Sequence, residues 1–101
     1  MGDDMVQSIA TIREKTIPIV KKYGVKRIYL FGSYARGEAH DESDIDFYME
    51  KGRLRSLIQY FSLVNDLEKT FDCHVDLISK NISDQEFITS IEKEGILLYE
   101  E

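Results

Sequence analysis

Cysteine, proline and tryptophan are nearly missing from this chain of 101 residues, which has one, one and none of them. The single cysteine, Cys73, cannot form a disulfide within the chain, and this agrees with a reducing compartment. No apolar run approaches the length that crosses a membrane, and the acidic N-terminus lacks the basic start and apolar stretch of a signal peptide. We therefore expect a cytoplasmic protein with no membrane partner.

Basic residues are also scarce relative to acidic ones. The chain has 13 lysines and arginines against 19 aspartates and glutamates, so its net charge is −6 at pH 7. Binding to nucleic-acid phosphates is driven largely by basic side chains that release counterions, so we expect no direct nucleic-acid binding by this chain alone. The acidity fits a metal–nucleotide substrate better, because divalent cations bridge carboxylates and phosphates.

The length and composition are those of one soluble globular domain over residues 1–101, with 43% apolar and 32% charged residues. Apolar residues at helical spacing predict helices over residues 5–23 and 53–71. Pro18 lies inside the first pattern and is expected to kink the helix or to mark a restart near Thr16. Apolar runs of strand character predict strands over residues 25–31, 44–49 and 73–78.

Three shorter segments complete the pattern. A short helix is expected over residues 33–36, and Ser83 and Glu86 have the spacing of a capping box for a helix that ends near Glu94. Residues 96–99 are expected to be an extended or docking segment. Helices and strands alternate, beginning and ending with a helix, which predicts an α+β fold in which a small three-stranded sheet has helices on one face.

Two acidic residues interrupt the second predicted strand. Alternate side chains of a strand point to the same side, so Asp44 and Asp46 project together, about 6–7 Å apart at Cα, while Ile45 points to the core. Carboxylates with this reach can converge on two metal ions roughly 3.5–4 Å apart. The alternative is a pair of solvated acids. A cation explains better why like charges stand on one face of a strand, where aspartate is normally depleted.

Asp76 is a third acid within an apolar strand. If the second and third strands are neighbours, Asp76 can stand beside Asp44 and Asp46 and complete an oxygen site of the kind that Mg²⁺ prefers. The alternative is that Asp76 caps a turn or pairs with a lysine. His40 and His74 have no second ligand at metal spacing in the sequence, so we expect both to be structural or solvated.

Gly32 and Ser33 directly follow the first predicted strand. Glycine allows the backbone to approach a ligand closely, and a serine at a helix start can offer its hydroxyl and N–H to a phosphate. The alternative is an ordinary strand-to-helix turn with Ser33 as the helix cap.

These segments together resemble the nucleotidyltransferase superfamily that includes DNA polymerase beta, and within it the minimal nucleotidyltransferases (MNT). The resemblance covers nearly the whole chain and rests on Gly32-Ser33-Tyr34-Ala35-Arg36-Gly37, Ser43-Asp44-Ile45-Asp46 and Asp76. It implies the polymerase beta-like palm fold, with a mixed sheet. Larger relatives, such as aminoglycoside nucleotidyltransferases, add a helical substrate domain, so we expect this chain not to bind a large substrate unaided.

The resemblance also implies a role for each acid. Asp44 and Asp46 would bridge two Mg²⁺ ions, while Asp76 would bind the catalytic ion and accept the proton of the attacking hydroxyl.

Four further residues are implied in nucleotide binding. Gly32 and Ser33 would hold the β- and γ-phosphates of ATP. Arg36 would steer phosphate or the acceptor, its alternative being a surface ion pair with Glu38 or Asp41. Ser43 would orient Asp44 or its loop.

MNT chains are often paired with HEPN-family RNase toxins, so the resemblance implies an antitoxin that transfers AMP from ATP to a tyrosine of such a partner. Two alternatives stay open. The first alternative is a binding module that neutralises its partner by occlusion. The second is an enzyme that modifies a small molecule or RNA. The sequence does not decide whether the chain is a homo-oligomer.

Overall fold

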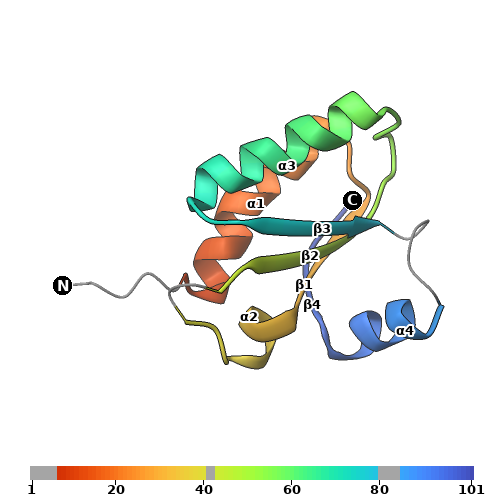
Figure 1. The fold of residues 1–101 in the computed structure, drawn as a ribbon. Coiled ribbons are helices and arrows are strands. Elements are labelled where there is room, and N and C mark those ends of the chain that lie inside the picture. Colours follow the sequence, from red (N-terminus) through yellow and green to blue (C-terminus); the bar gives the residue numbers. More distant parts are fainter. Residues whose placement is uncertain (1–6, 41–42, 80–84) are drawn as a thin grey trace.

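A four-stranded sheet lies between two layers of helices in the computed structural model, which describes residues 7–40, 43–79 and 85–101 (Figure 1). The elements in order are α1 (Ile9–Tyr23), β1 (Arg27–Phe31), α2 (Gly32–Arg36), β2 (Ile45–Glu50), α3 (Leu57–Phe71), β3 (Val75–Ser79), α4 (Gln85–Glu94) and β4 (Ile96–Glu100).

Local caps set the ends of the two long helices. Ser8 accepts a hydrogen bond from the Thr11 N–H at the start of α1, and Gly24 ends that helix in the left-handed conformation. A capping box of Ser56 and Gln59 starts α3 at Leu57, four residues later than the periodicity predicts. Within the described segments no helix has both the length and the apolar character needed to span a bilayer.

The structure tests the prediction for Pro18 in the first helix, but not the capping box predicted for the last helix. Pro18 lies inside α1, which runs from Ile9 to Tyr23 as one helix, so the restart near Thr16 is wrong. Ser83, half of the capping box expected for the last helix, lies outside the described residues.

The sheet has the strand order β3-β2-β1-β4. β1 pairs antiparallel with β2 and with β4, whereas β2 pairs in parallel with β3. Parallel neighbours need a crossover connection, and α3 supplies it. The mixed sheet and the adjacency of the second and third strands are therefore as expected. The predicted count of three strands is wrong, because residues 96–100 add β4 along the free edge of β1.

Helices cover both faces of the sheet, not one as expected. α1 and α3 bury the larger core on one face, where Ile12, Leu67 and Phe47 are completely shielded from solvent. α4 covers part of the other face, because Ile88 and Ile91 pack on Tyr48 of β2 (Figure 1). Tyr48 falls between two residues that face the larger core, so strand alternation sends it to the second face. A six-residue strand therefore serves two cores.

The turn between β1 and α2 requires glycine for two reasons. Gly32 has φ of +75°, in the left-handed region that other residues avoid. A Cβ on Gly32 would also overlap the carboxylate Oδ2 of Asp46 on the neighbouring strand. Gly37, at the other end of α2, has φ of +74°, but a Cβ added there would meet no atom within 4 Å. The backbone of Gly32 is therefore in direct contact with an acid of β2.

Gly32→Ala is expected to lower the free energy of unfolding more than Gly37→Ala does. Each substitution should lower the free energy of unfolding by about 1 kcal/mol, because alanine disfavours the left-handed backbone. Only Gly32→Ala also displaces the Asp46 carboxylate. Urea unfolding of the two variants and the parent chain measures the difference. Equal losses would show that Asp46 moves aside without cost.

Candidate active site

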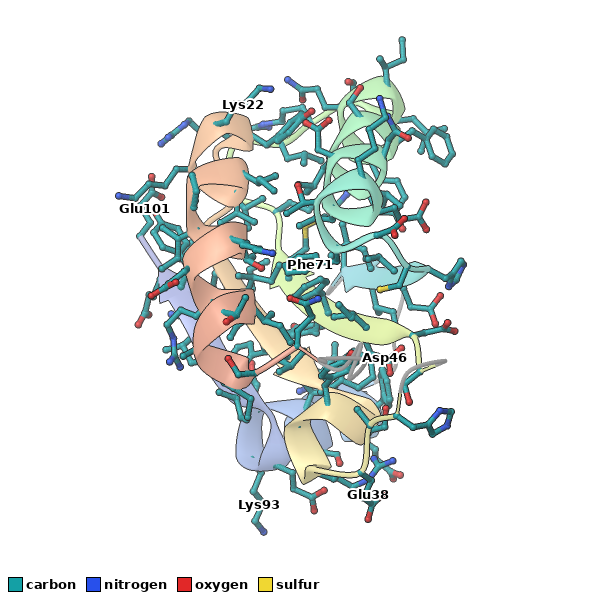
Figure 2. All side chains as sticks on the ribbon, turned by 90° about the vertical axis from the view of Figure 1, so that its left-hand side faces the viewer. Lys22, Glu38, Asp46, Phe71, Lys93 and Glu101 are labelled. Atoms are coloured by element: carbon teal, nitrogen blue, oxygen red, sulfur yellow. The ribbon has the colours of Figure 1, made fainter. Side chains whose placement is uncertain are left out.

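Two neighbouring strands bring the three predicted acids together. Asp46 of β2 and Asp76 of β3 are direct partners in the parallel pairing, and Asp44 lies immediately before β2. Ile45 and Val75, which point to the opposite face, are buried in the larger core and fix the strands. Figure 2 shows Asp46 on the side of α2, whereas Phe71, the last residue of α3, lies on the side of α1 and α3. The acids thus share one face of the sheet, near the first residues of β2.

The carboxyl group of Asp46 is the most perturbed acid of the cluster. Its partial burial, its hydrogen bond with Asp76 and the charges of Asp76 and Asp44 raise its pKa from 3.8 to about 6. The charge of Arg36 acts in the opposite direction, with a smaller effect. Negative charge is therefore unfavourable at this position unless a cation balances it.

His74 joins the cluster, and the sequence interpretation missed it. Its Nδ1 lies 3.4 Å from Asp44 Oδ2 and 3.7 Å from Asp76 Oδ1. Ligand atoms of these three exposed residues all fall within 4.8 Å of one another. The signal was present in the sequence, since residues 74 and 76 are two apart on a strand and so share a face.

The donor set suits a divalent cation. Asp44, Asp46 and Asp76 offer hard carboxylate oxygens, which Mg²⁺ prefers, and burial together with the neighbouring acids raises the pKa of Asp46, so a cation there would stabilise its ionised form. The imidazole of His74 would suit a transition metal such as Mn²⁺ better than Mg²⁺. The oxygen atoms outnumber the nitrogen, so the residues fit Mg²⁺.

The Gly-Ser turn borders the carboxylates. Gly32 touches Asp46, as described above, and Ser33 follows it in the first turn of α2. Ser33 is half-buried, and its carbonyl oxygen accepts hydrogen bonds from the N–H groups of Gly37 and Glu38. The backbone of this turn therefore lies within reach of a group bound at Asp46.

Arg36 is the last residue of α2, and Ser43 lies in the loop before β2. The Nε of Arg36 donates to Glu38 Oε1 at 3.0 Å, which is the surface ion pair given above as the alternative. The Ser43 hydroxyl accepts from the His40 N–H at 2.9 Å, and the Ser43 N–H donates to the His40 carbonyl at 2.9 Å. Ser43 thus ties the loop before Asp44 through its bonds to His40.

A cavity of about 500 Å³ opens beside the carboxylates. Asp46 and Asp76 line it together with Phe31 and residues of α3, including Tyr60 and Phe61. The acids therefore face a volume large enough for part of a substrate.

The sequence matches the polymerase beta nucleotidyltransferase family over residues 14–101. It is 46% identical over 78 residues to MJ1379 of Methanocaldococcus jannaschii, which is provisionally named a protein adenylyltransferase; the alignment covers 74% of this chain and 78% of that protein. It is 36% identical over 76 residues to the protein adenylyltransferase MntA of Thermococcus cleftensis, with 75% of each chain covered.

The fold is also that of a solved relative. A crystal structure of a toxin–antitoxin with AMP-PNP superposes with a TM-score of 0.76 and 26% identity, over 88% of this chain and 73% of that one. The expected fold is confirmed in kind, with the corrections given above. With three acids on one face, a glycine turn against them and a sequence match over most of its length, this chain belongs to the polymerase beta nucleotidyltransferase family.

Proposed function

We propose that this chain transfers AMP from ATP to a tyrosine hydroxyl of a HEPN-family RNase toxin and thereby acts as its antitoxin. The gathering of Asp46 with its strand partner Asp76 and with Asp44, beside the Gly32 turn, carries the proposal. Two similar proteins support the acceptor class: the Thermococcus relative is named a protein adenylyltransferase, and the solved relative is a toxin–antitoxin with an ATP analogue.

The carboxylates would hold two Mg²⁺ ions, with Asp44 and Asp46 contributing to both and Asp76 to one. Bound there, the ions would lower the pKa of the acceptor hydroxyl and neutralise charge on the departing pyrophosphate. The bound cations would favour the ionised form of Asp46, which burial and the neighbouring acids disfavour in the free protein.

The remaining roles follow from position. The N–H groups of the turn at Gly32 and Ser33 would bind the β- and γ-phosphates, and close approach is feasible because Gly32 has no side chain. Asp76 would accept the proton of the tyrosine hydroxyl while its oxygen attacks the α-phosphorus in line. Arg36 would leave Glu38 to steer the phosphates, and Ser43 would keep the loop before Asp44 in place.

Removing both bridging acids is expected to abolish transfer. Asp44→Asn with Asp46→Asn should lower the rate at least about a thousandfold, because the charge that positions the metal ions is lost. Each form of the chain is mixed with ATP, Mg²⁺ and the protein encoded beside the chain in the genome. The mass of that neighbouring protein is then measured.

The matched control is Glu14→Gln with Glu92→Gln, which removes two charges from exposed helix positions. It should transfer at the parent rate. An unmodified neighbour with the parent chain contradicts the proposal, and full neutralisation of the toxin by the double asparagine variant would assign neutralisation to occlusion.

Asp46→Asn is expected to stabilise the metal-free protein at neutral pH. The pKa of Asp46 is raised from 3.8 to about 6 in the fold, so its contribution to stability is fully present below pH 4 and is lost as pH rises through 6. Allowing for solvent screening, the variant should gain about 1 kcal/mol at pH 7.5 and much less near pH 4.

Urea unfolding at both pH values, with EDTA or with Mg²⁺, measures this gain. Mg²⁺ should stabilise the parent chain at pH 7.5 more than it stabilises the variant. A variant that is less stable than the parent in EDTA at pH 7.5 would refute the assigned repulsion.

A further inference from the structure

One part of α3 presents apolar side chains to solvent. Leu57, Ile58 and Phe61 are 69%, 78% and 60% exposed, although they lie within the first two turns of a helix whose other face is buried. Single exposed apolar residues are ordinary on protein surfaces, but a cluster of three large ones marks a contact site.

This apolar cluster is continuous with the active site. Phe61 and Tyr60 line the same cavity of about 500 Å³ that Asp46 and Asp76 line. On the other side of Tyr60, a second cavity of about 230 Å³ extends to Leu57. A molecule seated against the start of α3 therefore reaches the carboxylates without leaving the surface.

The far end of this surface is basic in a chain that is acidic as a whole. Lys51 and Arg55 line the second cavity beside Leu57. Within the described residues neither has a carboxylate within 4.0 Å, whereas Arg53 between them pairs with Glu101 at 2.8 Å. The two cations are therefore available to acidic side chains of another molecule.

Side chains of α3 occupy two outward backbone groups of β3 where this strand borders the surface. In a parallel strand the backbone N–H and C=O groups of one residue point to one side, and those of the next residue point to the other side. The His74 carbonyl accepts from the Ile45 N–H and therefore points toward β2. The backbone groups of Val75 and Leu77 therefore point outward, away from β2. The Val75 N–H donates to Glu68 Oε2, and the Tyr60 hydroxyl donates to the Leu77 carbonyl at 2.6 Å. These two bonds disfavour addition of a strand at this edge, so we expect a partner to bind here through side chains.

We propose that the start of α3, formed by Leu57, Ile58 and Phe61 with the cations Lys51 and Arg55, docks the protein that carries the acceptor hydroxyl. The partner contributes an apolar segment flanked by acidic side chains, and docking directs its hydroxyl into the cavity of Asp46 and Asp76. The inference rests on the proposed function. A second copy of this chain is a poorer occupant, because a two-fold contact would bring the same cations, Lys51 and Arg55, to this surface in place of acidic side chains.

Phe61→Glu and Arg55→Glu test the surface in the chain of 101 residues, with Leu97→Glu as the matched control. Leu97 is also an exposed apolar residue, 39% exposed on β4 at the opposite edge of the sheet. Affinity for the neighbour-encoded protein is measured by calorimetry without ATP, so that binding is determined independently of transfer. Transfer kinetics are then measured with ATP and Mg²⁺.

Phe61→Glu should weaken binding at least about tenfold, as loss of a central aromatic contact does. It should raise KM for the partner by at least a similar factor. Arg55→Glu should weaken binding less, with a reduced dependence on salt, and Leu97→Glu should match the parent chain.

The two proposals fail in different ways. Binding that depends on Phe61 without any transfer refutes the proposed function and keeps the docking surface. Transfer with parent-like affinity in Phe61→Glu overturns the docking surface and keeps the function. A parent chain that sediments as a dimer, and that Phe61→Glu converts to a monomer, assigns the surface to a second copy and overturns the partner.

Discussion

The parallel pairing of β2 with β3 sets Asp46 and Asp76 side by side against the repulsion of their carboxylates. What holds them there is the opposite side of the same strands, where Ile45, Val75 and Leu77 are buried beneath the long helices. Burial of such side chains contributes roughly 1.5–3 kcal/mol each, enough to offset the repulsion of partly solvated acids. The hydrophobic core therefore holds the carboxylates of Asp46 and Asp76 in position.

The second face of the sheet is divided along its length. Near the start of β2 it carries the carboxylates and stays open to solvent, whereas further along Tyr48 is completely buried beneath Ile88 and Ile91 of α4. Within the described residues the Tyr48 hydroxyl has no hydrogen-bond partner, and burial raises its pKa to about 12. The hydroxyl therefore stays protonated, and no additional negative charge develops on the face that carries the acids.

The sequence was sufficient for most of the elements and for the pair Asp44 and Asp46, because both follow from periodicity. Asp76 was placed beside them only on the condition that the second and third strands are neighbours, which the structure meets. Strand alternation placed Asp44 and Asp46 together, and the same rule applied to residues 74 and 76 would have added His74. Whether strands are neighbours is decided by tertiary packing, so the position of β4 and the two-sided cover of the sheet were not predictable. The Arg36 pair with Glu38 was one of two interpretations, and local spacing could not choose between them. The contact of Gly32 with Asp46 joins different strands and required the structure.

Two side chains that bond to the outer edge of β3 affect the tendency of the protein to aggregate at high concentration. An outer strand with free N–H and C=O groups is a template on which further chains can polymerise into fibrils. Glu68 and Tyr60 occupy two of those groups on β3, which is the outer strand of the parallel pair. The helix that connects the two strands thus also acts against aggregation of the folded chain.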